Sequence, residues 1–381
     1  MHGMWEAGGV ASYIRLVSRL QQHSGLELFF LDSQFQDQQA IASPHSFSSI
    51  FITDGVELIT QAEFLNLDLL HLHTDIDLPD HLPLPVIRSV HNHNPYCLSG
   101  SKHLKQWSQP CDRRYSPFGC LWGHGVDRCG SVRPQNLLQN FRRIQREQQL
   151  LQRVSTITYS QFVKDQMVRS GYTANQIYVL LLPAPPQEAY HPPPQEEIPH
   201  FLFLGRITPE KGLDILLKAI ATLEVPIHLD IAGTGNPQQE KRIQHHIEQL
   251  KLSDRVTVWG WVDEVVRRSL LHRSRAVIFP SVWHEPAGLV TLEAAAAGRA
   301  IVASRVGGIP EYATALENAI LVAPNNPIAL TKQIETLAIQ YQEACRLGWM
   351  GYQNAIRFSL ENHGEQLMQC YQRAIASKES H

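Results

Sequence analysis

The sequence predicts an α/β protein with two doubly wound domains, each built on a parallel β-sheet. Two observations lead to this prediction. Short apolar runs alternate with amphipathic helical stretches along the chain, and a proline-rich segment interrupts the alternation once. That segment, PAPPQEAYHPPPQEEIP at 183–199, contains seven prolines and suits neither a strand nor a helix interior. A chain of 381 residues is also long enough for two domains of ordinary size.

The expected strands fall on both sides of this segment. In the first domain they are residues 26–33, 68–73, 85–93, 155–160 and 177–182. In the second domain they are residues 200–205, 227–233, 256–260, 276–281, 300–304 and 319–323. Their nearly continuous hydrophobicity is typical of parallel strands that are buried on both faces. We therefore expect a first domain over 1–184, a linker over 185–199 and a second domain over 200–356.

Composition and charge exclude several classes of protein. No apolar run approaches the roughly 20 residues of a membrane span. Residues 1–9 lack the charged and apolar parts of a signal peptide. The net charge of −3 and the sequence pI near 6.7 give no positive electrostatic field that would attract nucleic acid. We therefore expect a cytoplasmic protein that does not bind nucleic acid.

Two cations are expected where the first strand of the second domain ends. That strand closes at Gly205, the following loop carries Arg206 and Lys211, and a helical pattern begins near Gly212. Arg provides a planar fork and Lys a mobile point charge, a combination that suits a diphosphate. The competing interpretation is an ordinary solvated loop.

The stretch EPAGLVTLEAAAAG at 285–298 adds two carboxylates and a helix start to the same edge. Free amides near Gly288 and Leu289 can bind an anion, and the absence of a side chain at Gly288 permits close approach. Glu285 precedes the helix, and Glu293 lies within it among apolar neighbours. A carboxylate can accept hydrogen bonds from both hydroxyls of a sugar diol. Together these groups indicate a nucleotide-sugar site.

At this point the residues resemble a known family, the retaining glycosyltransferases of family 4, also called group 1, which have the GT-B fold. The resemblance covers residues 200–324 and rests on the Glu-x7-Glu element formed by Glu285 and Glu293 together with several short motifs. These motifs are GRITPEKG (205–212), AGTG (232–235), WGWV (259–262), PSVWHEPAGL (280–289) and VGGIPE (306–311). The resemblance implies two Rossmann-like domains that face each other across a cleft.

The resemblance also implies roles for the second-domain residues. Arg206 and Lys211 would bind the donor diphosphate, and Glu293 would bind the ribose hydroxyls. Glu285 would hold the transferred sugar. The amides of Gly288 and Leu289 would hold the distal phosphate, and the backbone near Val262 would contact the base.

The first domain resembles the family less closely. Gly8 and Gly9, in EAGGVASYIRLVSRL (6–20), match the family's glycine loop and would approach the diphosphate. SVHNH (89–93) resembles the strand that ends beside the reacting sugar, so His91 is the preferred catalytic histidine. As a neutral imidazole it would bind a sugar hydroxyl or stabilise developing charge. The rival histidines are His71, His73 and His93.

Family membership further implies transfer with retention of configuration and without a catalytic metal. The acceptor hydroxyl would give its proton to the leaving phosphate. The D-x-D in TDID (74–77) is discounted as a metal site because the phosphate site is already cationic. Residues 357–381 resemble the terminal helix that such chains return to the first domain.

Two departures from the family concern the first domain. Family members begin with a strand before the glycine loop, but only MHGMWEA precedes it here. Either the coding start lies upstream, or the first sheet lacks its central strand. The family's Asn-Gly-x-Asp is replaced by LLPAPP (181–186), which predicts a different hinge.

A third departure is an insertion at about 95–135 with four cysteines: Cys97, Cys111, Cys120 and Cys129. Four thiolates suit a closed tetrahedral zinc site that would fold a loop with little core of its own. The wide spacing leaves free thiols as an equal alternative, followed by disulfides. Seven arginines occur here or just after it: Arg113, Arg114, Arg128, Arg133, Arg142, Arg143 and Arg146. They suggest an anionic acceptor or a peripheral membrane contact, or else a solvated helix face.

The sequence therefore predicts a retaining glycosyltransferase that moves a sugar from a nucleotide-sugar to a glycan, lipid or small-molecule hydroxyl. It would need no catalytic cofactor and would carry a structural zinc as a candidate. One alternative is a GT-B epimerase or phosphorylase, although the cofactor-lysine motif of a phosphorylase is not found. The alternative from another class is a non-catalytic scaffold that binds nucleotide-sugars or is organised by zinc.

Overall fold

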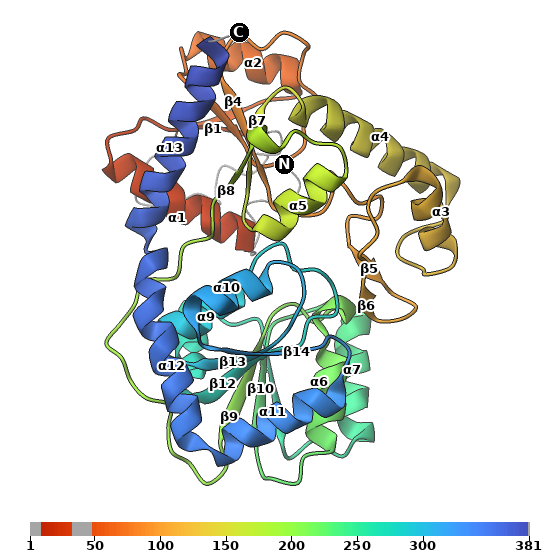
Figure 1. Cartoon of the computed structure of the whole chain (residues 1–381), viewed down its shortest axis with the longest axis vertical. Coiled ribbons are helices and arrows are strands. Elements are labelled where there is room, and N and C mark those ends of the chain that lie inside the picture. Colours follow the sequence, from red (N-terminus) through yellow and green to blue (C-terminus); the bar gives the residue numbers. More distant parts are fainter. Residues whose placement is uncertain (1–8, 33–47, 380–381) are drawn as a thin grey trace.

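The computed structural model describes residues 9–32 and 48–379. Figure 1 shows two α/β units along the long axis, with the first domain above the second. The insertion lies to one side, with its helix α3 (Pro117–Gly125) and the short pair β5 (His103–Leu104) and β6 (Gln109–Pro110). The linker, residues 185–199, contains no helix or strand.

The second domain is built on a six-stranded parallel sheet in the order β11-β10-β9-β12-β13-β14. Its strands are β9 (His200–Leu204), β10 (His228–Ala232), β11 (Val256–Gly260), β12 (Ser274–Phe279), β13 (Ala300–Ser304) and β14 (Ala319–Val322). All six predicted strands are confirmed. The order reverses between β9 and β12, and at such a reversal the loops at the carboxyl ends of the strands diverge and leave room for a ligand.

Helices cover both faces of this sheet. One apolar core joins the sheet to α6 (Leu213–Ala221), α7 (Pro237–Gln249), α11 (Pro327–Ile339) and α12 (Tyr341–Ala355). The other joins it to α8 (Glu264–Arg273), α9 (Leu289–Ala296) and α10 (Ile309–Leu316). Burial on both faces explains the continuous apolar strand sequences.

The first domain has a four-stranded parallel sheet in the order β3-β4-β7-β8. Its strands are β3 (Leu70–Leu72), β4 (Val86–Val90), β7 (Ser155–Thr158) and β8 (Ile177–Val179). The helices of this domain are α1 (Gly9–His23), α2 (Gly55–Phe64), α4 (Pro134–Leu151) and α5 (Gln161–Arg169). Ser160 caps α5, as its sequence indicates, by accepting a hydrogen bond from the Val163 amide.

A second, smaller sheet in this domain was not expected. The predicted strand at 26–33 forms β1 (Phe29–Asp32), which pairs in parallel with β2 (Ser48–Phe51), a strand that the sequence analysis missed. Among the described residues, β1 and β3 do not pair. Residues of β1, β3 and α1 line a cavity of about 1430 Å³.

The last helix, α13 (Leu360–Glu379), runs along the molecule and reaches the first domain (Figure 1). The Gln21 side chain of α1 donates a hydrogen bond to the Tyr371 hydroxyl at 2.8 Å. The His363 imidazole lies 3.0 Å from the Tyr13 hydroxyl. Leu367 and Ala374 complete the apolar core under α1. Within the described residues, no helix combines the length and hydrophobicity that a membrane crossing requires.

One glycine at the switch point gives a test of this packing. Gly212 has φ of 74°, and a Cβ there would lie 1.9 Å from the Pro280 carbonyl oxygen. Gly260, in the same domain, has φ of 68° but no atom within 4 Å of such a Cβ. We expect Gly260→Ala to cost about 1–2 kcal/mol for the left-handed backbone. Gly212→Ala should cost clearly more, because backbone atoms must also move. Scanning calorimetry of both variants measures the difference, and equal losses in Tm would contradict the close packing.

Candidate functional site

Two loops meet where β9 and β12 end, at the reversal of strand order. The first carries Arg206 and the short turn Pro209–Lys211, and the second spans residues 280–288. The Val282 amide donates a hydrogen bond to the Glu210 carbonyl at 2.9 Å and ties the loops together. Lys211 and Glu285 are 74 positions apart in sequence, and this arrangement brings them together.

Lys211 and Glu285 form a largely buried ion pair. The Lys211 Nζ lies 2.8 and 3.0 Å from the two carboxylate oxygens of Glu285. The Ser281 hydroxyl also donates to this carboxylate. The side chains of Lys211 and Glu285 are only 14 % and 7 % exposed. Removing either side chain would leave the other as an uncompensated buried charge, which is strongly destabilising. The pair is therefore expected to stay formed.

Arg206 is the less restrained cation of the predicted pair. Its side chain is 67 % exposed, and its guanidinium lies 3.6 Å from the Glu210 carboxylate. A surface pair of this kind is weak. The Arg206 side chain can therefore change its orientation at little cost.

The start of α9 faces the start of α1 across the domains. No side chain caps α9, so its first amides are open to an anion. A Cβ at Gly288 would lie 2.8 Å from the Tyr312 ring, which leaves no room for a side chain there. A Cβ at Gly9 would lie 3.4 Å from the Leu289 side chain, so the two helix starts are close. Gly8 lies outside the described residues.

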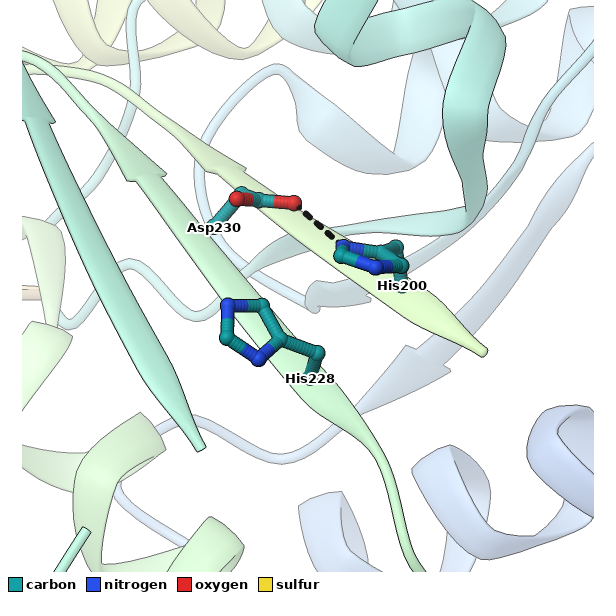
Figure 2. A group of neighbouring side chains, drawn as sticks. All are labelled: His200, His228 and Asp230. Carbon is teal, nitrogen blue, oxygen red and sulfur yellow. Dashed lines mark hydrogen bonds and ion pairs between the residues drawn. The ribbon is translucent and has the colours of Figure 1, made fainter. Parts of the chain in front are cut away.

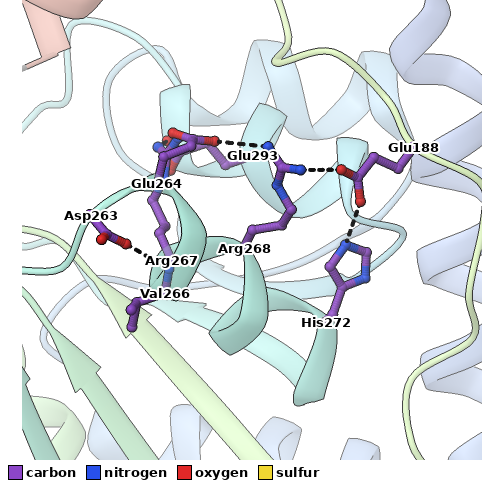
Figure 3. A network of polar contacts seen from close by, with 8 residues as sticks. All are labelled: Glu188, Asp263, Glu264, Val266, Arg267, Arg268, His272 and Glu293. Atoms are coloured by element: carbon purple, nitrogen blue, oxygen red, sulfur yellow. Dashed lines mark hydrogen bonds and ion pairs between the residues drawn. The ribbon is translucent and has the colours of Figure 1, made fainter.

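Glu293 lies in α9, and its carboxylate is almost buried. It pairs with Arg267 of α8, which also contacts Glu264 (Figure 3). Burial raises the pKa of Glu293, and the Arg267 guanidinium opposes that rise. Glu293 and Glu285 thus have different cationic partners. Val262 follows β11 and packs against the core on this side of the sheet.

Figure 3 also shows the linker joined to α8. The Glu188 carboxylate contacts Arg268 and lies 3.6 Å from the His272 imidazole. These contacts place the linker beside the helix that supplies Arg267. No local sequence pattern predicts this network.

His91 stands directly after β4, at the carboxyl edge of the first sheet. Its Nε2 lies 3.0 Å from the His73 Nδ1, and its ring stacks on Tyr159 with centroids 4.9 Å apart. Burial lowers the pKa of His91 well below its usual value, so the ring is neutral. The rival His71 is engaged by the hydroxyls of Tyr371 and Ser89, at 2.7 and 2.8 Å.

The third rival, His93, connects the two domains. It is fully buried, and its Nε2–H donates to the His284 carbonyl at 2.6 Å. The His284 ring accepts a hydrogen bond from the Gly307 amide at 3.0 Å through Nδ1. The other ring nitrogen of His284 donates to Asp112 of the insertion at 2.9 Å. Thus the residue that precedes Glu285 is held from three sides, a role that the sequence analysis did not assign.

The motif VGGIPE supplies a second link between the domains. The Glu311 carboxylate accepts hydrogen bonds from the amides of Gln161 and Phe162, at 2.6 and 2.7 Å, and so caps α5 of the first domain. The Tyr312 hydroxyl donates to the Tyr159 carbonyl at 2.6 Å. These roles of Glu311 and Tyr312 were not predicted from the motif.

The four cysteines of the insertion line one small cavity, and the structure contains all four as free thiols. Burial raises the pKa of Cys129 to about 12, and the sulfurs of Cys97, Cys111 and Cys120 add to the rise.

Three of the seven arginines have partners within the chain. Arg113 pairs with Asp127, Arg146 lies 2.8 Å from Asp77, and Arg143 donates to two backbone carbonyls. Because Asp77 is engaged by Arg146, this contact also accounts for one carboxylate of the discounted D-x-D.

Among the described residues, one group of metal-ligand side chains lies within 4.8 Å: His200, His228 and Asp230 (Figure 2). Asp230 already accepts hydrogen bonds from the His200 Nδ1 at 2.8 Å, the Trp259 indole at 2.8 Å, and Arg273. These donors satisfy its carboxylate without a metal. The group also lies toward the amino ends of β9 and β10, away from the switch point.

The buried neutral histidines make stability depend on pH. The pKa of His93 is lowered by burial from 6.5 to about 3. As pH falls below 6.5, His93 therefore becomes protonated in the unfolded chain but stays neutral in the folded chain. The folded state loses stability as a result. We expect His93→Gln to reduce the slope of unfolding free energy against pH by up to about 1.4 kcal/mol per pH unit. Urea unfolding between pH 6 and 4 measures this slope. The exposed His245→Gln is the control, and an unchanged slope in His93→Gln would contradict the assignment.

The second half of the chain matches a known sequence family. Residues 188–354 match the family described as glycosyl transferases group 1. A stretch of 133 residues is 32 % identical to an uncharacterised glycosyltransferase of Methanocaldococcus jannaschii, covering 35 % of this chain and 34 % of that protein. A stretch of 187 residues is 30 % identical to D-inositol 3-phosphate glycosyltransferase of Segniliparus rotundus, covering 48 % and 41 %. The chain thus spans less than half the length of these curated relatives.

Solved structures resemble nearly the whole chain. Sucrose-phosphate synthase from Thermosynechococcus elongatus superposes with a TM-score of 0.77 at 19 % identity, covering 99 % of this chain and 98 % of that one. Anabaena HepE in complex with UDP and glucose superposes with a TM-score of 0.68 at 15 % identity, covering 95 % of each chain. The chain therefore has the GT-B fold, and its residues 188–354 match the group 1 glycosyl transferases.

Proposed function

We propose that this protein is a retaining glycosyltransferase that uses a nucleotide-diphosphate sugar. The observation that carries the proposal is the buried pair of Lys211 and Glu285 at the switch point of the second sheet. A cation that is already dehydrated and oriented binds a diphosphate with little further loss of solvation. The family match of residues 188–354 supports the same chemistry.

The diphosphate would lie between the two loops and the start of α9. Lys211 meets it from the buried side, and Arg206 folds over it from the exposed side. The uncapped amides near Gly288 and Leu289 supply neutral donors. These groups stabilise the leaving diphosphate as its negative charge grows, so the reaction needs no metal ion at this point.

The sugars would lie between the carboxylates and His91. Glu285 accepts from hydroxyls of the transferred sugar, and Glu293 accepts from the ribose diol. His91 is neutral and can accept a hydrogen bond or donate one. The acceptor hydroxyl attacks from the side of the leaving phosphate and gives it a proton. This course would retain the anomeric configuration.

The similar proteins point to sugar and polyol acceptors. Relatives are named for D-inositol 3-phosphate, α-maltose 1-phosphate and glycogen, and one structural neighbour contains UDP and glucose. These names describe those proteins, and they make UDP-glucose the first donor to test here.

Replacement of Lys211 tests the donor site. We expect one of UDP-, GDP- and ADP-glucose to bind in calorimetric titration, and Lys211→Ala to weaken binding by at least about tenfold, since a charge-assisted contact contributes 1.5–3 kcal/mol. Lys218→Ala, on the exposed side of α6, should bind normally. NMR of the product from an α-linked donor should show an α-linkage. Equal losses in both lysine variants would contradict the site, and binding without transfer to any acceptor would favour the scaffold.

We also propose that α3 docks on an anionic membrane surface and brings the enzyme to a membrane-bound acceptor. Its outer face exposes Phe118 (87 %), Leu121 (41 %) and Trp122 (64 %), a spacing of three and four residues. Exposed aromatic and aliphatic side chains on one helix face are typical of interfacial binding. Residues 113–146 contain seven arginines and a single acidic residue, Asp127. Six of these arginines are exposed: Arg113, Arg114, Arg128, Arg133, Arg142 and Arg146.

The double variant Phe118→Ser with Trp122→Ser tests this surface. We expect it to lose cosedimentation with vesicles of phosphatidylglycerol, because the apolar insertion is removed while the charge is unchanged. A matched control replaces Phe64 and Trp261, which are similarly exposed at 82 % and 65 %, by serine. The control should bind like the parent chain. Vesicles of phosphatidylcholine should bind neither the parent chain nor the variants. Binding of the Phe118→Ser, Trp122→Ser variant to anionic vesicles would refute the docking surface.

A further inference from the structure

The helix α3 has its apolar side outward and its metal-binding residue types inward. While Phe118 and Trp122 are exposed, His124 is 1 % exposed and Cys120 is partly buried. Cys120 and His124 are four residues apart and therefore share one helix face. A helix oriented in this way needs something other than an apolar core to hold it against the domain.

The inner face of α3 borders a cavity of about 20 Å³, lined by all four cysteines of the insertion. Two buried histidines, His103 and His124, line the same cavity, and the Nε2 atom of each lacks a hydrogen-bond partner. The Nδ1 of His124 lies 2.8 Å from the Ser131 carbonyl, so it is the protonated nitrogen and Nε2 carries a lone pair. Unsatisfied buried nitrogens are uncommon in native proteins. Both histidines stand beside the four cysteines at this cavity.

A buried cation stands beside the same sulfurs. Lys102 is 2 % exposed, and its ammonium donates to two neutral oxygens, the Arg113 carbonyl at 2.7 Å and the Gln166 amide at 3.1 Å. No carboxylate in the described part of the chain forms an ion pair with it. The Lys102 amide also donates to the Cys97 sulfur at 3.4 Å. A buried ammonium is costly without a negative partner. Four thiolates on a divalent ion carry a net charge of −2 and would supply that partner.

We propose that this cavity holds one structural zinc ion, coordinated by the thiolates of Cys97, Cys111, Cys120 and Cys129. Soft thiolate ligands in a closed tetrahedron are the preferred environment of structural zinc. On binding, each thiol releases its proton to solvent as its sulfur becomes a ligand. No three of the four sulfurs lie within 4.8 Å of one another in this structure, so zinc binding requires the cysteine side chains to turn toward the ion.

The zinc fixes a contact with the donor site. Asp112 follows Cys111 directly and accepts the hydrogen bond from His284, the residue before Glu285. Zinc therefore orients the insertion against the loop that carries Glu285, and it also holds α3 with its apolar face outward. The insertion has little other regular structure to do this, since only α3 and the pair β5 and β6 lie within it.

Metal analysis of the full chain tests the proposal without an activity assay. We expect about one zinc ion per purified chain by mass spectrometry of the metal content. We also expect cobalt substitution to give the absorption bands of tetrahedral thiolate coordination. Each of the four Cys→Ser variants should lose the zinc. Cys345→Ser and Cys370→Ser, which change cysteines outside the insertion, should keep it.

Further measurements guard against misfolded variants. Chelation of the unmodified chain should increase proteolysis within residues 95–135, while circular dichroism shows that the two domains remain folded. His200→Gln should keep the zinc, because that histidine belongs to the separate group around Asp230. Loss of zinc from His124→Gln but not from Cys111→Ser would overturn the four-thiolate set. A chain that binds no zinc after reconstitution, or whose intact mass shows disulfides, would overturn the site itself.

Discussion

The buried ion pair between Lys211 and Glu285 is the contact on which the arrangement of the site depends. It joins the loop after β9 to the loop after β12, and these two strands are neighbours only because the order of the sheet reverses between them. Close packing supports the pair, since Gly212 lies against the Pro280 carbonyl with no room for a side chain. The charges compensate each other in a region that excludes water, so neither can be removed alone without cost. Loops held in this way keep their groups oriented before a ligand arrives, which is what electrostatic stabilisation of a leaving group requires.

The loop of Glu285 and the helix α10 carry the contacts that join the first domain to the site. His93 donates to the His284 carbonyl, and Glu311 caps α5 through two amides. Tyr312 fills the space beside Gly288 and donates to the Tyr159 carbonyl. Each contact joins a strand or helix end of one domain to a strand or helix end of the other. These directional hydrogen bonds therefore position the candidate groups of the two domains relative to each other. The linker and α13 also connect the two domains.

The insertion connects the site to the outer surface. Asp112 holds His284 from one side, and α3 presents Phe118 and Trp122 to solvent on the other. Between them lie the four cysteines and the uncompensated Lys102. A segment with so little apolar core needs another source of order, and a thiolate-bound ion would provide it. With such an ion, one small module would both orient the loop of Glu285 and fix the surface proposed to meet a membrane.

The sequence by itself determined the two parallel sheets, the strands of the second one, and the residue types of the site. Continuous apolar runs specify buried parallel strands, and the combination of Arg206, Lys211, Glu285 and Glu293 is the pattern from which phosphate and sugar binding is predicted. Local patterns did not reveal β2, because SSIF is too short to distinguish from a loop. Only the tertiary structure decided that Lys211 pairs with Glu285, that Glu293 pairs with Arg267, and that His91 lies against His73 while His93 crosses to the other domain. These partners are far apart along the chain, and the carboxyl edges of the folded sheets bring them together. The spacing of residues along the chain does not predict such pairings, because the order of the strands in the sheet determines them.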